Sequence, residues 1–237
     1  MSTITPDVRS AMLAAAERLL ADSPDRDIAT RAVCEAVGVT QPVLYRLFGD
    51  KNGLLDALAD DGLRRYAEHK GRQPQTGDPV ADLRAGWDDH MEFARRNPAL
   101  YHLMFAPRPR SHAQARRQIM DLLEAALLRC SAIGALRVSP SVAAQIILPA
   151  NVGLALSLIA QPSLFADPDL SVRMREAVFG AVLTEPAAPE EGDPVPAAAL
   201  RLRSQLAVSG TSALEPAETA LLDRWLERLA SRGSVGR

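Results

Sequence analysis

Two short helical segments joined by a glycine turn constrain the fold of this chain most strongly. The spacing of apolar residues predicts helices over residues 30–37 and 41–48. Gly38 ends the first helix, because glycine readily takes the positive φ found at helix ends. Thr40 stands at the N-cap position of the second, where a hydroxyl is preferred. Two helices joined by so tight a turn cross steeply, so the pattern predicts a helix-turn-helix unit whose second helix protrudes.

The remainder of the sequence also predicts helices. Alanine, leucine and arginine, which favour helices, are abundant, and the strict alternation typical of strands does not persist for long. Prolines and glycines divide the chain into segments. The other expected helices span residues 6–22, 51–70, 79–96, 98–105, 111–133, 139–161, 168–183, 197–207 and 216–230. The predicted fold class is therefore all-α.

The predicted organisation begins with a three-helix domain over residues 1–50, which carries the helix-turn-helix. A fourth helix over residues 51–70 then joins it to a larger C-terminal helical bundle over residues 79–237. Within that bundle, residues 185–196 are rich in proline, acid and alanine, so we expect a flexible linker there.

The overall charge does not point to a nucleic-acid partner. The formal net charge is −2, and residues 1–51 hold six basic against seven acidic side chains. A strongly basic chain would have indicated nucleic-acid binding directly. Any affinity for DNA must therefore come from where the cations lie, and a dimer would double the number of phosphate contacts.

Cysteine usage and hydropathy indicate a soluble cytoplasmic protein without a membrane partner. Cys34 and Cys130 are far apart in sequence, which gives neither a disulfide framework nor a cysteine metal site. No basic segment followed by an apolar one opens the chain, so we expect no secretory signal. The weakly charged stretch 138–166 is broken by three prolines, and we interpret it as a buried helix rather than a membrane span.

An enzyme is an alternative that the motifs do not favour. Asp88, Asp89 and His90, with His102 downstream, could suggest a metal or acid–base site. Their spacing matches no metal-ligand, nucleophile or phosphate-loop motif, so Asp88 and Asp89 are better interpreted as a solvated helix face. We therefore predict no catalytic residues, no metal and no cofactor.

The segment that carries the function is TRAVCEAVGVTQPVLYRLFGDKNGLLDAL, residues 30–58. Its spacing places Leu44 inward, together with Leu47 and Phe48, and leaves Gln41, Tyr45 and Arg46 facing out as a reading surface. In this order of residues, the segment resembles the DNA-binding domain of the TetR (tetracycline-repressor-like) family of regulators. The resemblance covers roughly residues 5–66 and implies a transcriptional regulator that binds a double-stranded operator, most often as a repressor.

The resemblance also implies roles for individual residues. Gln41 matches a base-reading position, and Tyr45 and Lys51 match phosphate contacts. Two departures stand out: Leu47 replaces a common His or Tyr, and Ala29 replaces a common hydroxyl cap, so Thr30 or Asp27 is expected to cap instead. The full implied DNA-binding set is Thr30, Arg31, Thr40, Gln41, Pro42, Val43, Tyr45, Arg46 and Lys51.

The segment 78–105 resembles ligand-binding domains of some members of the same family. This resemblance implies a helical bundle that dimerises and holds an unidentified small-molecule effector. Apolar side chains with a few polar groups are typical of such sites. The alternative is that the same aromatic residues only fill a core. The candidate effector-binding residues are Trp87, His90, Met91, Tyr101, Met104, Phe105 and Asn151.

Small residues in segments 144–160 and 168–183 predict a homodimer interface, because they let helices approach closely. A twofold dimer would place its two reading helices about 34–36 Å apart, or farther on a longer site. We expect effector binding to lower operator affinity through its preference for one of two conformations. The remaining alternative is a helical protein–protein adaptor that does not bind DNA.

Overall fold

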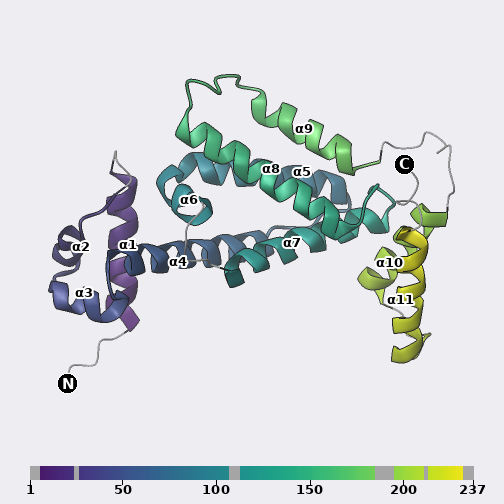
Figure 1. The fold of residues 1–237 in the computed structure, drawn as a ribbon, viewed down its shortest axis with the longest axis horizontal. Helices are drawn as coiled ribbons and strands as arrows, with labels where there is room; N and C mark the ends of the chain where they lie inside the picture. Colours follow the sequence, from purple (N-terminus) through teal and green to yellow (C-terminus); the bar gives the residue numbers. More distant parts are fainter. Residues whose placement is uncertain (1–5, 24–26, 107–112, 185–194, 211–212, 232–237) are drawn as a thin grey trace. The chain divides into compact units, whose positions relative to one another are not determined.

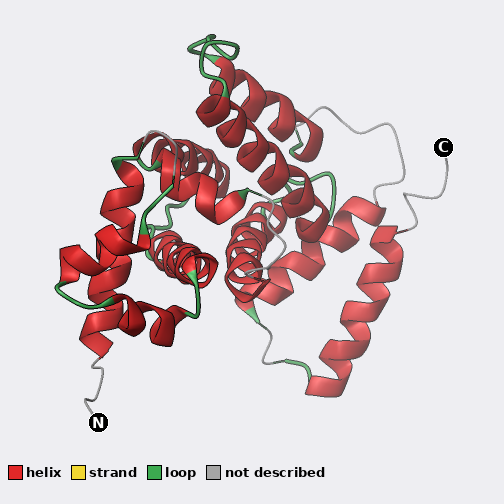
Figure 2. Cartoon of the chain, turned by 60° about the vertical axis from the view of Figure 1, so that its left-hand side comes forward, coloured by secondary structure: helices red, strands yellow, loops and turns green. Residues whose placement is uncertain are grey.

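The computed structural model describes residues 6–23, 27–106, 113–184, 195–210 and 213–231. Every regular element in these ranges is a helix, apart from one isolated bridge between Leu136 and Leu183 (Figures 1 and 2). The all-α prediction is confirmed. The helices are α1 Pro6–Ala21, α2 Thr30–Val37, α3 Gln41–Phe48, α4 Lys51–Gly71, α5 Pro79–Arg96, α6 Pro98–Phe105, α7 Ala113–Ala132, α8 Pro140–Ala160, α9 Leu170–Val182, α10 Val195–Ser209 and α11 Pro216–Ser231.

Turn residues explain where the helix ends differ from the sequence prediction. The chain before α9 forms a turn around Asp167, whose backbone oxygen accepts from Leu170 N and whose carboxylate accepts from Asp169 N. This turn delays α9 to Leu170. In contrast, α10 starts earlier than predicted, at Val195, because a proline is tolerated in the first turn. The rest of the predicted linker lies outside the described residues.

The chain divides into two compact units that do not follow the sequence in simple blocks. Unit 1 holds residues 1–73, 90–119 and 154–165, and unit 2 holds residues 74–89, 120–153 and 166–237. Helices α5, α7 and α8 therefore contribute one part to each unit. The domain boundaries drawn along the sequence stay a prediction, and the two units are described separately.

Unit 1 is built around α1, α4 and α6. Leu44 on α3, and Leu54 and Leu58 on α4, are fully buried in its core. Helices α2 and α3 pack against each other, and α2 also packs on α1 (Figure 1). Gly62 lets α4 approach α6 closely, because a Cβ there would lie only 3.0 Å from Met104 Sδ.

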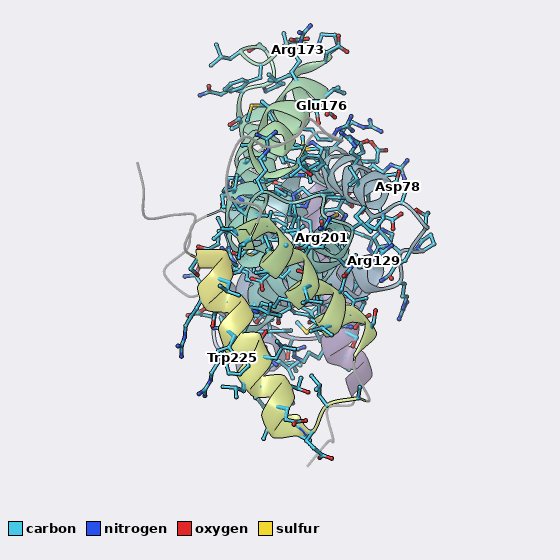
Figure 3. The ribbon with its side chains drawn as sticks, turned by 90° about the vertical axis from the view of Figure 1, so that its right-hand side faces the viewer. Asp78, Arg129, Arg173, Glu176, Arg201 and Trp225 are labelled. Carbon is cyan, nitrogen blue, oxygen red and sulfur yellow. The ribbon has the colours of Figure 1, made fainter. Side chains whose placement is uncertain are left out.

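Polar contacts join α5 and α9 in unit 2, beside an apolar core that includes Leu127, Phe179 and Val182. Trp87 Nε1 on α5 donates to Ser171 Oγ on α9 at 3.1 Å. Arg175 Nη1 donates to both Asp88 carboxylate oxygens at 2.6 Å, which ties the same two helices together. Helices α10 and α11 pack on each other, and Trp225 on α11 is 52% exposed (Figure 3).

Candidate nucleic-acid interface

Gly38 forms the turn between α2 and α3. Its backbone is left-handed, with φ 70° and ψ 32°, and its N–H points back to the carbonyls of Cys34 and Glu35. A Cβ at this position would meet nothing within 4 Å. The positive φ, and not lack of space, is therefore what favours glycine here. This turn lets α3 begin only three residues after Gly38.

Helix α3 presents a polar face to solvent. Leu44 is fully buried and fixes the helix on the body of unit 1. Gln41, Tyr45 and Arg46 are exposed, as predicted, and Pro42 is exposed beside them. Val43, Leu47 and Phe48 are half-buried at the edges of this face. The short helix thus offers four exposed side chains, Gln41, Pro42, Tyr45 and Arg46, which we call the α3 face.

The N-termini of α2 and α3 lack side-chain caps, contrary to prediction. Thr40 occupies the N-cap position of α3, but its hydroxyl makes no capping hydrogen bond. Ala29 occupies the N-cap position of α2, again without a side-chain cap. Thr30 is already helical, and the Asp27 carboxylate accepts from Ile28 N instead. The exposed Thr40 hydroxyl is therefore not committed to capping its own helix.

Lys51 is placed by a tight junction between α3 and α4. The Asp50 carboxylate accepts from Gly53 N at 2.7 Å and caps α4. A Cβ on Gly53 would lie 1.9 Å from the backbone oxygen of Phe48, so the junction requires glycine. Lys51 is the first residue of α4 and therefore follows α3 directly.

Two of the predicted DNA-binding cations form ion pairs with acids of the same chain. Lys51 Nζ donates to Asp27 Oδ2 at 2.7 Å, and this bond lowers the pKa of the Asp27 carboxyl. Arg31 Nε donates to Glu35 Oε1 at 2.7 Å, one helical turn along α2. The sequence analysis predicted neither ion pair. The i,i+4 spacing of Glu35 could have revealed its pair, whereas Asp27 and Lys51 are 24 residues apart.

The predicted effector residues fall into two groups. In unit 1, His90 lies buried between two phenols: its Nδ1 is 2.5 Å from Tyr66 Oη and its Nε2 is 2.6 Å from Tyr101 Oη. Burial raises the pKa of the Tyr101 hydroxyl. Phe105 packs on both His90 and Tyr101. Met104 is fully buried and Met91 is half-buried in the same unit.

Trp87 and Asn151 belong to unit 2. Trp87 packs edge-on against Phe179, with ring centroids 5.9 Å apart, as a core residue does. Asn151 is 4% exposed, and its Oδ1 has no hydrogen-bond partner among the described residues. A buried carbonyl oxygen without a donor is unusual in a folded protein.

A cleft of about 680 Å³ opens elsewhere in unit 1. Its walls come from α1 and from the junction of α5 and α6, with Arg18, Arg95 and Leu100 among the lining residues. None of the seven predicted effector residues lines it. In the described part of the chain, no three His, Cys, Asp or Glu side chains are grouped as metal ligands would be.

Known protein families account for most of the chain. Residues 12–58 match the family of bacterial regulatory proteins named tetR, and residues 83–218 match the tetracyclin repressor-like C-terminal domain. The chain belongs to the TetR family. This regulator is therefore a DNA-binding transcription regulator and not an enzyme. No curated protein matches its sequence at a significant level.

Solved structures share the fold of the regulator. SmeT, the repressor of the multidrug efflux pump SmeDEF of Stenotrophomonas maltophilia, aligns with a TM-score of 0.60 at 21% identity, over 79% of this chain and 97% of its own. A Rhodococcus sp. RHA1 protein of unknown function aligns at 0.62 and 24% identity, over 78% and 100%. NalD, the secondary repressor of the MexAB-OprM multidrug efflux pump of Pseudomonas aeruginosa, aligns at 0.54 and 19% identity, over 76% and 97%. These likenesses confirm the N-terminal helix-turn-helix and the C-terminal helical domain.

Proposed function

We propose that this TetR-family regulator is a repressor that binds its operator through the α3 face and leaves it when a small-molecule effector binds. The exposure of Gln41, Pro42, Tyr45 and Arg46 on a helix anchored by buried Leu44 carries this proposal. A short protruding helix of this kind fits the major groove, where base edges are read.

The residues of the α3 face suit different tasks on the duplex. The carboxamide of Gln41 can pair with an adenine edge, and Pro42 and the half-buried Val43 can touch thymine methyl groups. Tyr45 and Arg46 lie one turn along and can reach phosphate or base. Phosphate contacts from Arg31 and Lys51, and from the hydroxyls of Thr30 and Thr40, would fix the position of α3 in the groove.

We infer that a second copy of the chain covers an apolar face of unit 2. Among the described helices, α8 alone is long and apolar enough to cross a membrane: its most apolar 18 residues have a mean hydropathy of 1.9, and only 33% of them are buried. A soluble DNA-binding protein would cover such a helix with a partner. Its exposed residues include Val142, Ile146, Pro149 and Gly153.

Helix α9 adds small exposed residues to this proposed interface. Ala177, Gly180 and Ala181 are exposed, and a Cβ on Gly180 would meet nothing within 4 Å. Small residues let facing helices approach closely. We propose a homodimer in which α8 and α9 pair with their symmetry mates, so that two α3 faces read one operator.

The effector is proposed to act through α4. Lys51 begins this helix, and Tyr66, which contacts His90, lies about 22 Å further along it at 1.5 Å per residue. A ligand that changes the packing around His90 would therefore move the helix that carries Lys51. Such a ligand lowers operator affinity only if it prefers the conformation that binds DNA poorly. We place the regulator in the cytoplasm, where its operator is.

The test is a gel shift with the duplex that flanks the regulator's own gene, against an equal-length duplex of shuffled sequence. We expect preferential binding to the flanking duplex that weakens steeply as salt rises. Gln41→Ala should reduce the preference for the flanking duplex, because it removes one base contact and no phosphate contact. A wild-type protein that shifts neither duplex at low salt would contradict the proposal and favour a protein–protein adaptor.

A further inference from the structure

Two of the three cations expected to contact DNA, Lys51 and Arg31, form ion pairs in the protein without DNA. Lys51 Nζ lies 2.5 Å from Asp27 Oδ1 and 2.7 Å from Asp27 Oδ2, so one ammonium faces both oxygens of one carboxylate. On α2, Arg31 Nε contacts one carboxylate oxygen, Oε1 of Glu35, at 2.7 Å. In both pairs a carboxylate holds a cation that operator binding, as proposed above, would give to a phosphate.

Hydrogen bonds with Ser23 and Ile28 hold Asp27 in place for this contact. Its N–H donates to Ser23 Oγ at 3.1 Å, and its Oδ1 accepts from Ile28 N at 2.9 Å. Both partners of the pair still reach solvent, since the side chains of Asp27 and Lys51 are 62% and 39% exposed. The pair is therefore fixed in position and also accessible to a competing anion.

We propose that Asp27, and Glu35 beside it, are phosphate substitutes that set the DNA affinity of the regulator. This inference rests on the proposed operator binding. When the protein meets DNA, Lys51 must exchange the Asp27 carboxylate for a phosphate, and the carboxylate left behind repels the backbone. The exchange lowers affinity for every duplex alike, because it involves no base. It gives a function to two of the seven acidic side chains that offset the six basic ones in residues 1–51.

The pair also changes how binding depends on salt. A cation that is already neutralised by a carboxylate gains little net neutralisation when it moves to a phosphate. Removing the acid makes the same cation a full phosphate partner, which steepens the slope of log K against log salt by about 0.9 per contact. This slope separates a phosphate substitute from an acid that only shapes the fold.

The experiment compares Asp27→Asn with wild type on one duplex of about 30 base pairs, long enough for more than one turn. Asparagine keeps the oxygen that accepts from Ile28 N but lacks the charge. We expect Asp27→Asn to bind about two- to fivefold more tightly per protomer, the strength of an exposed ion pair, with the steeper salt slope. Glu35→Gln should act in the same direction through Arg31.

Repeating the comparison in a protein that also carries Lys51→Gln shows whether Asp27 acts through Lys51. The gain from Asp27→Asn should vanish when Lys51→Gln is also present, as a double-mutant cycle measures. Asp22→Asn is the matched control, because Asp22 is exposed near the end of α1 and its loss changes the net charge equally. An equal gain in the Lys51→Gln background, or an equal gain from Asp22→Asn, would overturn the inference. If the wild type binds DNA and Asp27→Asn shows no gain in affinity, only this inference is overturned. If the wild type does not bind DNA at low salt, the proposed function is overturned as well.

Discussion

The phenol oxygen of Tyr66 lies 2.5 Å from Nδ1 of His90, and both side chains are buried. On the other side of the ring, His90 Nε2 reaches Tyr101 Oη at 2.6 Å. Helices α4, α5 and α6 each contribute one member of this chain of hydrogen bonds. Since α4 also starts with Lys51, the arrangement links the interior of unit 1 to a residue proposed to contact DNA.

Tyr66→Phe should destabilise the protein by about 1–3 kcal/mol, because it deletes a hydrogen bond in a buried site. Urea unfolding followed by circular dichroism measures this change. Tyr45→Phe is the matched substitution on the α3 face, where the side chain is 47% exposed. It should leave the free energy of unfolding unchanged and weaken DNA binding instead. Equal stability losses in the two variants would contradict this assignment.

Gly53→Ala should destabilise the N-terminal helices by at least about 1 kcal/mol, because its Cβ would collide with the Phe48 carbonyl and push α4 away from α3. Thermal unfolding gives the measurement, and a DNA-binding assay should show a parallel loss as Lys51 moves. Gly86→Ala on α5 is the control, since a Cβ there meets nothing within 4 Å. A Gly53→Ala protein as stable as Gly86→Ala would show that the junction is looser than described.

The dimer interface predicts that Ala177→Glu and Ala181→Glu produce monomers, because each buries an unpaired carboxylate between copies. Light scattering at micromolar concentration measures the mass. Ala125→Glu places the same side chain on an exposed site of α7 and should leave the dimer intact. If both α9 variants still have the mass of a dimer, the interface lies elsewhere on the protein.

The acid stability of the regulator should depend on Glu92. Its pKa is lowered from 4.5 to about 2, mainly by the hydrogen bond from Arg95 and then by that from Arg96. A carboxyl whose pKa falls on folding contributes stability above pH 4.5 and loses it as the pH drops towards 2. Melting temperatures of wild type and Glu92→Gln should therefore differ at pH 6 and converge near pH 2. A difference that stays constant over this range would show that the ion pairs do not form.

Local signals in the sequence predicted the helices and the α3 face, because both depend on neighbours along the chain. Gly38 marks a helix end by its positive φ, and the position of Leu44 follows from apolar spacing. The capping role of Thr40 did not hold, since the identity of a residue does not fix where its hydroxyl points. The pair of Asp27 and Lys51 could not be predicted, because only the folded chain brings together residues 24 positions apart.

The candidate effector residues illustrate the same limit of sequence patterns. In a sequence, an aromatic residue at helical spacing gives the same pattern whether it fills a core or lines a pocket. Trp87 proves to pack against Phe179 and to donate to Ser171, as a core residue does. Asn151, by contrast, is buried, and no described residue donates a hydrogen bond to its Oδ1. Only the positions of neighbouring side chains separate these two cases.

The most direct test of the account is a photocrosslink from the α3 face to DNA. A photoreactive amino acid in place of Gln41 should crosslink to bases of the bound duplex, because α3 is proposed to lie in the major groove. The same amino acid in place of Ala125 on α7 should give no crosslink. If the protein binds DNA but crosslinks to it from position 125 and not from position 41, the result would contradict the proposed binding through α3.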